Sequence, residues 1–348
     1  MTRCSDPSYR ILAVRSLRKQ VRQLAEHLGG IRRGEDIEAI HRARVASRRL
    51  RAALGMFRAC WKRKQVKAWK RQIRRLARSL GEARDLDVLI EFLTSSLAGV
   101  SDRILVPGIA CLLSHVEHRR QRIQPRVLKA LDRAERGGAI EAMQARVRST
   151  LEGAGDAEFV ASEYVLGQAK KNVRKRLKKL FDESSGLADA EQRERHHTMR
   201  IAAKRLRYTL ELAGPVYSGD PADGDLASTA DAVKRLQTLL GEIHDCDVWV
   251  EKFKDFARKV AGEIQRCFGT SQRFERLRPG LDYLRQERKD RRRQVFGELV
   301  TFWQELKDQG VWDRLATILE WGGTRAKSPQ KSSEKSSDSS PAEVVPQA

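Results

Sequence analysis

Cysteine is scarce in this sequence, and its spacing suits neither a disulfide framework nor a metal site. The 348 residues include five cysteines, at positions 4, 60, 111, 246 and 267, and no two of them form a Cys-x-x-Cys pair. An odd number of scattered cysteines is typical of proteins in a reducing compartment. We therefore expect a cytoplasmic protein without disulfides, metal ion or cofactor.

Long apolar runs and nucleotide-binding loops are also missing. The longest stretch without a polar side chain is residues 104–113, whereas a membrane-spanning helix needs about 20 apolar residues. The N-terminus has no apolar core of the kind found in signal peptides. These observations do not support a membrane protein. The sequence also has no Gly-x-x-x-x-Gly-Lys-Ser/Thr loop, so it does not support nucleotide hydrolysis.

What the sequence has instead is positive charge. Lysine and arginine number 69 against 46 aspartates and glutamates, which gives a formal net charge of +23. Such an excess opposes compaction by self-repulsion, and an anionic partner would relieve it. The candidates are nucleic acid, an anionic membrane surface and a polyphosphorylated ligand.

The apolar residues of the chain follow a helical pattern. They recur at spacings of three and four, and runs with the alternation of strands are absent, which predicts an all-α fold. The expected helices, separated by glycine breaks, are 8–28, 36–60, 64–80, 83–98, 103–136, 157–182, 190–213, 227–241, 243–264, 274–309 and 311–321. We expect a folded domain over residues 1–322 and a disordered, serine-rich tail over 323–348.

The sequence contains an internal repeat. The matched segments are 41–51 (HRARVASRRLR) with 197–207 (HTMRIAAKRLR), 80–88 (LGEARDLDV) with 240–248 (LGEIHDCDV), and 18–22 with 170–174. Their order is the same in both copies, so we expect a duplicated helical bundle. Its halves, about 8–150 and about 157–320, should be related by a pseudo-two-fold axis and enclose a basic central groove.

Each copy of the longest segment predicts an amphipathic helix with one basic face. At about 100° per residue, the basic residues fall within one sector of roughly 80°, opposite an apolar stripe. The basic rows are His41, Arg44, Arg48 and Arg51 in the first copy and His197, Arg200, Lys204 and Arg207 in the second. Such a row matches a linear polyanion better than a single phosphate.

The region around the first row is free of acidic residues. Residues 39–81 contain 15 lysines or arginines and no aspartate or glutamate. A helix face that meets only solvent normally intersperses acidic side chains, which relieve repulsion between like charges. The pattern therefore favours a site that binds an anion.

The repeated motifs resemble the CHAD family, the histidine-bearing α-helical domain. The resemblance rests on H-x-x-R-V-A-x-R-R-L-R in the first copy and H-x-x-R-I-A-x-K-R-L-R-Y in the second, each followed by L-G-x-x-x-D-x-D, and covers residues 8–320. It implies a duplicated bundle whose basic groove binds inorganic polyphosphate, and some members associate with polyphosphate granules. The ExExK motif of a CYTH domain is absent, so the chain is similar to the stand-alone, non-enzymatic form.

The resemblance also implies a polyphosphate-binding site made of the repeated basic residues. Its expected members are His41, Arg44, Arg48, Arg49, Arg51, His197, Arg200, Lys204, Arg205 and Arg207, joined by Arg18, Arg22, Arg74, Arg78, Lys170 and Arg174. We expect no catalytic residue and no metal ligand.

Two other functions stay open on the sequence alone. Nonspecific binding of RNA or DNA needs only charge, although proteins that bind bases interleave aromatic residues with basic ones, and aromatics make up 6% here. A metal-dependent phosphohydrolase could use His197, His244 and Asp245. The repeat argues against it, because Arg84 occupies the position equivalent to His244.

The repeated motifs also contain acidic residues. They are Asp85 and Asp87 in the first copy and Asp245 and Asp247 in the second. We expect these aspartates either to cap helices after the glycine breaks or to pair with arginines of the repeat.

Overall fold

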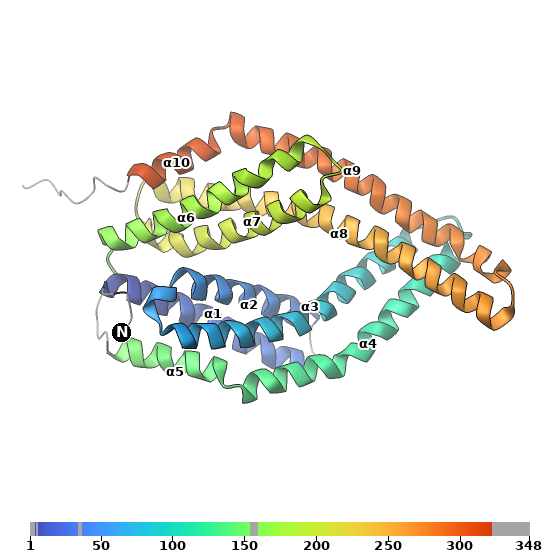
Figure 1. Cartoon of the computed structure of the whole chain (residues 1–348), viewed down its shortest axis with the longest axis horizontal. Coiled ribbons are helices and arrows are strands. Elements are labelled where there is room, and N and C mark those ends of the chain that lie inside the picture. The colour runs from blue at the N-terminus through green and yellow to red at the C-terminus, as the bar shows by residue number, and fades with distance from the viewer. Residues whose placement is uncertain (1–3, 5, 34–36, 154–158, 322–348) are drawn as a thin grey trace, which may run out of the picture.

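The computed structural model describes residues 4, 6–33, 37–153 and 159–321, and these residues form helices with no strand among them (Figure 1). The predicted all-α fold is confirmed. Residues 323–348, predicted to be a disordered tail, lie outside the described residues. None of the described helices is both long and apolar enough to cross a membrane.

Ten α-helices make up the described part of the chain, and short 3₁₀ turns adjoin several of them. The first five are α1 (Pro7–Arg33), α2 (Ile37–Met56), α3 (Arg63–Gly99), α4 (Val106–Arg136) and α5 (Ala139–Glu152). The second five are α6 (Glu163–Ser184), α7 (Arg193–Ala213), α8 (Ala222–Phe268), α9 (Arg278–Asp308) and α10 (Val311–Trp321).

The helices pack in the same order in the two halves. α1 packs on α2, α2 on α3 and α3 on α4, and likewise α6 packs on α7, α7 on α8 and α8 on α9. Between the halves, α2 contacts α7, and α4 contacts α9 at the end of the molecule far from the N-terminus (Figure 1). The two helices that carry the basic rows therefore meet at the middle of the molecule.

The apolar stripes predicted for α2 and α7 are buried. Each of the stripe residues is at most 6% exposed. They are Ala43, Ala46, Leu50 and Leu54 on α2 with Phe57 directly after it, and Met199, Ala202, Leu206 and Leu210 on α7. Because one face of each helix is fixed in the core, the basic face must point away from it.

Several predicted helix boundaries are wrong. α3 runs without a break through Gly81, α8 through Gly241 and α1 through Gly29 and Gly30. A glycine inside a helix costs only about 1 kcal/mol relative to alanine, which the packing of a long apolar face outweighs. The aspartates after Gly81 and Gly241 consequently lie inside helices, and the prediction that they are capping residues is wrong.

α5 has no counterpart among the expected helices. It lies between two glycine-containing segments and covers only 14 residues. Its buried residues Ile140, Met143 and Val147 follow helical spacing, and they pack the helix mainly against α1. The short length and the flanking glycines hid a helix that tertiary packing stabilises.

α4 and α9 approach each other through a pair of glycines. A Cβ atom on Gly108 would lie 2.2 Å from the Leu277 carbonyl oxygen, and one on Gly280 would lie 2.1 Å from the Leu105 carbonyl oxygen. Both glycines follow a proline, in the segments LVPG and LRPG. The contact is therefore reciprocal, and neither position has room for a side chain.

The second aspartate of each repeated motif is an ion-pair partner. The Asp87 carboxylate accepts a hydrogen bond from Arg120 Nε at 2.6 Å, and Asp247 accepts one from Arg292 Nε at 2.6 Å. These pairs tie α3 to α4 and α8 to α9 at equivalent places. The arginines that pair with Asp87 and Asp247 come from α4 and α9, whereas Asp85 pairs with the motif arginine Arg44 as predicted.

Candidate functional site

The basic faces of α2 and α7 border one cavity, which we call the basic cavity. Its volume is about 290 Å³, and its residues come from α2, α3 and α7. The lining residues are Arg44, Ser47, Arg48, Arg51, Arg74, Ala77, Arg78 and Lys204. Six of these eight residues are cations and none is acidic, so the cavity is a concentrated source of positive potential.

Burial and mutual repulsion both act on the cations of this site. Burial, assisted by the charges of Arg200, Arg48, Arg51 and Arg44, lowers the pKa of Lys204 to about 8. Burial and neighbouring arginines also lower the pKa values of the Arg44 and Arg51 guanidinium groups. The free site is thus electrostatically unfavourable, and a bound anion would relieve the repulsion.

Two arginine N–H groups of the site have no partner within the protein. The Nε atoms of Arg51 and Arg200 are buried and form no hydrogen bond. A buried donor without an acceptor costs roughly 1–3 kcal/mol, more when it is charged.

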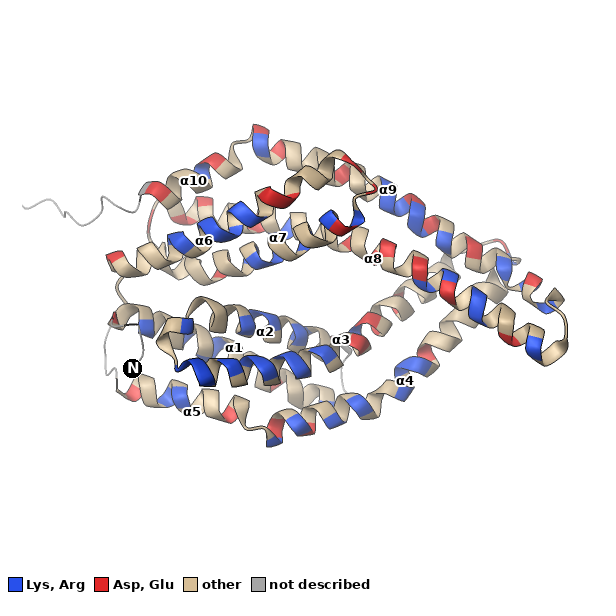
Figure 2. Ribbon diagram, viewed as in Figure 1, with Lys and Arg blue, Asp and Glu red and all other residues tan. Residues whose placement is uncertain are grey.

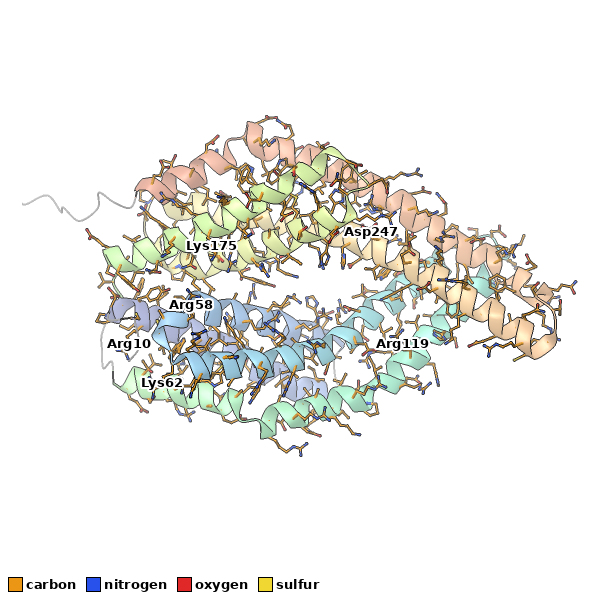
Figure 3. The ribbon with its side chains drawn as sticks, in the orientation of Figure 1. Arg10, Arg58, Lys62, Arg119, Lys175 and Asp247 are labelled. Carbon is orange, nitrogen blue, oxygen red and sulfur yellow. The ribbon has the colours of Figure 1, made fainter. Side chains whose placement is uncertain are left out.

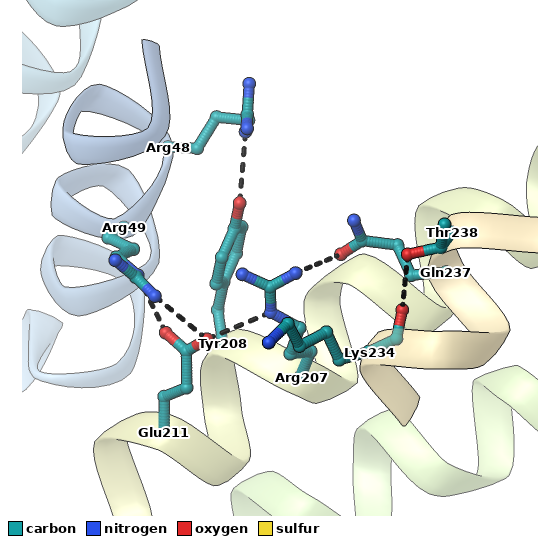
Figure 4. A network of polar contacts seen from close by, with 8 residues as sticks. All are labelled: Arg48, Arg49, Arg207, Tyr208, Glu211, Lys234, Gln237 and Thr238. Atoms are coloured by element: carbon teal, nitrogen blue, oxygen red, sulfur yellow. Dashed lines mark hydrogen bonds and ion pairs between the residues drawn. The ribbon is translucent and has the colours of Figure 1, made fainter. Parts of the chain in front are cut away.

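A buried tyrosine fixes one of the arginines. Arg48 Nε donates a hydrogen bond of 3.0 Å to the Tyr208 hydroxyl, and Tyr208 is only 4% exposed. Figure 4 shows this contact between α2 and α7. It orients the guanidinium group across the boundary between the halves, so Tyr208 positions a member of the site.

Two predicted site residues are neutralised by an acidic residue outside the motif. Arg49 binds both carboxylate oxygens of Glu211, at 2.8 and 3.2 Å, and Arg207 Nε binds Glu211 Oε1 at 2.9 Å (Figure 4). Glu211 lies four residues beyond Arg207, the last residue of the second row. Arg49 therefore joins α2 to α7, Arg207 pairs with Glu211 within α7, and neither arginine lines the basic cavity.

The first aspartates of the repeated motifs flank the site. Arg44 Nη1 lies 3.1 Å from Asp85 Oδ1. The Asp245 side chain is exposed, yet partial desolvation by the surrounding protein raises its pKa. The charge of Asp85 also raises the pKa of Asp245, whereas the charge of Arg200 lowers it. The two aspartates therefore repel each other electrostatically across the boundary between the halves, and each is attracted by one arginine of a basic row.

The motif histidines are half-buried beside these arginines. Burial and the charge of Arg84 lower the pKa of His41, while burial, Arg200 and Lys204 lower the pKa of His197. His197 Nδ1 lies 3.1 Å from His244 Nδ1. The neighbouring His196 is instead a core residue, 2% exposed, whose Nε2 contacts the Gly186 carbonyl oxygen at 2.9 Å.

Four of the predicted residues lie elsewhere. Arg18 and Arg22 line a separate cavity between α1 and α5. Lys170 and Arg174 donate hydrogen bonds to the carbonyl groups of Glu320 and Leu319, at the C-terminal end of α10. The electrostatic dipole of a helix favours cations at that end, so these two side chains stabilise the packing of α10 on α6.

Other basic residues extend the site beyond the cavity. Lys70 is half-buried, and burial together with the charges of Arg58, Arg74, Arg176 and Arg51 lowers its pKa. Figure 3 labels Arg58 in the first half and Lys175, next to Arg176, in the second. The predicted residue Arg205 is exposed on α7, and its charge lowers the pKa of Arg176.

Sequence reasoning missed Lys70 and Arg176 as site residues. Lys70 lies in the acid-free region, which was its signal, whereas no motif marked Arg176.

A larger cavity of about 700 Å³ adjoins the basic cavity and shares Arg44, Ala77 and Arg78 with it. Its walls mix apolar and charged side chains of both signs.

Comparison with known proteins identifies the family. The model of the CHAD domain matches residues 15–254. The chain belongs to the CHAD family. Its fold is similar to that of the crystal structure of the CHAD domain from the plant Ricinus communis, with a TM-score of 0.55 and 24% sequence identity over 78% of this chain and 91% of that one.

Among curated proteins, the CHAD chain is similar to an uncharacterized protein found in two strains of Mycobacterium tuberculosis. The identity is 28% over 271 residues, which is 76% of this chain and 48% of the relative. The chain thus spans about half the length of the curated relatives it matches. These comparisons support the fold and the family, and the chemistry must be argued from the site.

Proposed function

We propose that this CHAD protein binds inorganic polyphosphate in the basic cavity and does not hydrolyse it. The observation that carries the proposal is the lining of the cavity, with six cations from three helices and no carboxylate. Guanidinium groups bind phosphoryl oxygens through paired N–H donors, and five of the six cations that line the cavity are arginines. A protein with this property would collect on polyphosphate granules.

The extent of the basic surface favours a polymer as the ligand. Cations continue from the basic cavity to the cluster around Lys70, and Arg51 and Arg74 act in both places. A single phosphate would neutralise only a small part of this surface. A linear chain with one negative charge per phosphate can follow it and displace many counterions.

A nonspecific nucleic-acid site is the alternative, and the aromatic residues argue against it. Binding of single strands usually relies on stacking of bases on aromatic side chains. Among the described residues, none that lines the basic cavity is aromatic, and Tyr208, which adjoins the row, is buried and bonded to Arg48. Either polymer presents phosphate oxygens to the arginines, but a nucleic acid also carries bases, and the residues that line the cavity offer no aromatic surface on which those bases could stack.

Competition binding of the full chain tests the proposal. Labelled long-chain polyphosphate is displaced by unlabelled polyphosphate, RNA, DNA or ATP at one fixed salt concentration, with each competitor expressed per phosphate. We expect polyphosphate to compete best and ATP least. If RNA or DNA competes as well as polyphosphate does, the nucleic-acid alternative is correct.

A second assay tests the absence of catalysis. Hydrolysis of phosphoanhydrides usually needs Mg²⁺ held by carboxylates and an activated water. Of the two aspartates that flank the site, Asp85 is already paired with Arg44. Incubation with polyphosphate and Mg²⁺ should release no phosphate above a protein-free control. Release that disappears in the variants H197A and H244A would instead establish a metal-dependent phosphohydrolase.

A further inference from the structure

The two halves place different residues beside the motif histidine. His41 has Arg84 as its strongest charged neighbour, whereas His197 has His244 in direct contact. Arg84 and His244 are equivalent in the repeat, since LGEAR aligns with LGEIH. The first half thus holds a permanent cation at this position, and the second holds a group whose charge depends on protonation.

The contact between the histidines restricts how the pair can carry protons. The two Nδ1 atoms are 3.1 Å apart, and the ring centroids are 4.5 Å apart. One Nδ1 must donate its hydrogen and the other must accept it through a lone pair. A proton added at the Nε2 atom of the donor ring makes that ring cationic and strengthens the contact. A second proton would set two donors against each other, so the intact pair takes up one proton.

We propose that His197 and His244 together form a contact for the polyanion that gains one proton when the polyanion binds. The inference rests on the proposed function and adds a residue, His244, that lies outside the repeated basic row. The charge that Arg84 supplies permanently in the first half is supplied in the second half only when ligand is present.

The surroundings of the pair disfavour its protonation in the free protein. Burial and the charges of Arg200, His197, Lys204 and Lys252 lower the pKa of His244 to about 4. The groups that act on the pair or on these cations are Glu194, Arg200 and Lys204 on α7, Glu242, Asp245 and Lys252 on α8, and Arg44, Arg48, Arg51 and Asp85 on α2 and α3. Cations prevail among them, so phosphate oxygens close to the pair would reverse the sign of the local potential.

Proton uptake has a defined effect on affinity. A group whose pKa rises on binding favours binding below its bound pKa and ceases to do so above it. Affinity for polyphosphate should therefore rise as the pH falls from 8 to 6. At pH 6.5 Lys204, with a pKa of about 8, is already protonated, so uptake at that pH reports on the histidines.

Calorimetric titration of the full chain with long-chain polyphosphate at pH 6.5, in buffers of different ionisation enthalpy, measures the protons taken up. We expect net uptake by the unaltered protein and a clear reduction of it in the variant H244R. Because H244R carries a permanent charge, its affinity at pH 8 should exceed that of the unaltered protein by roughly threefold to tenfold. The variant H118R makes the same exchange at an exposed position on α4 and should leave proton uptake unchanged.

The variant R84H makes the reciprocal change in the first half. It creates a second histidine pair with His41, so proton uptake should increase and affinity at pH 8 should fall. This variant decides the matter if H244R does not fold. Binding without proton uptake, or equal uptake in H244R and H118R, would overturn the inference and leave polyphosphate binding intact. A lack of binding by the unaltered protein would instead refute the proposed function.

Discussion

The N-terminal part of α3 and the equivalent part of α8 share a place in the fold but not a charge. Residues 63–80 contain eight lysines or arginines and no acidic residue, whereas residues 223–240 contain three aspartates and two basic residues. Figure 2 shows the N-terminal part of α3 as a nearly continuous blue stretch. α3 contributes Arg74 and Arg78 to the basic cavity, and α8 contributes no lining residue.

The difference follows from what each segment packs against. α8 is covered by α10, and Asp225 lies 3.5 Å from Arg314 of that helix. Arg74 and Arg78 of α3 are exposed and face no such partner among the described helices. The halves thus share their packing but differ in charge, and most of the binding surface belongs to the first half.

The shared packing should respond equally in the two halves. The substitutions G108A and G280A each place a Cβ within about 2 Å of a backbone carbonyl oxygen, and each should lower the free energy of unfolding by about 2–4 kcal/mol. Chemical denaturation measures both. The control is G297A, on α9 with no atom within 4 Å of the added Cβ, which should stabilise by about 0.5–1 kcal/mol. A large effect in only one of the two variants would break the equivalence.

The charges should respond unequally. Arg74 and Lys234 are equivalent in the repeat and both exposed, but only Arg74 lines the basic cavity. R74E should weaken polyphosphate binding by about tenfold or more, while K234E should weaken it by less than about threefold. Titration at fixed salt compares them. Equal losses would show that both halves contribute charge to the site.

Lys204 is the cation that the second half contributes to the basic cavity. It should destabilise the free protein and favour the binding of polyphosphate. The folded state lowers its pKa from 10.5 to about 8, so the unfolded state binds more protons between these pH values and stability rises with pH there. K204M should raise the free energy of unfolding at pH 7 by about 1–2 kcal/mol and weaken polyphosphate binding. The gain should shrink between pH 8 and pH 10.5. Unchanged stability at pH 7 would contradict the account of a repelled, half-buried ammonium group.

Tyr208 has no equivalent in the first half, where Ala52 occupies its place. Y208F removes the hydroxyl that accepts the hydrogen bond from Arg48, at a cost of about 1 kcal/mol of stability. We expect polyphosphate affinity to fall by roughly twofold to threefold, because Arg48 keeps its charge while its guanidinium group is no longer oriented. A decrease equal to that of R48A would mean that the tyrosine does more than orient the arginine.

The sequence contained enough to predict the helices that carry the site. The spacing of Leu50, Leu54 and Leu206 defined the buried faces, and the histidine and arginine rows followed from them. The meeting of α2 and α7 was expected from the duplication. Arg74 and Arg78 could be included because they lie in the acid-free region.

What the sequence did not reveal depends on contacts between distant segments. Glu211 neutralises Arg49 from another helix. Arg174 donates a hydrogen bond to the Leu319 carbonyl group, which lies 145 residues later in the chain. The match between LVPG and LRPG was too short to stand out, although the crossing of α4 and α9 depends on it. Gly81 and Gly241 were misleading because the local preference of glycine is weaker than the packing of a long helix.

The most direct test of polyphosphate binding in the basic cavity is the salt dependence of affinity in two matched variants. R74E/R78E reverses two exposed charges that line the cavity, and R71E/R75E reverses two exposed charges on the same helix that do not. For the unaltered protein and R71E/R75E, the logarithm of affinity should fall steeply and in parallel with the logarithm of salt concentration. R74E/R78E should bind about 100-fold more weakly, with a slope shallower by roughly 0.7 for each phosphate that the variant leaves unneutralised. Equal decreases in affinity for the two variants, or a slope near zero for the unaltered protein, would contradict binding in the basic cavity.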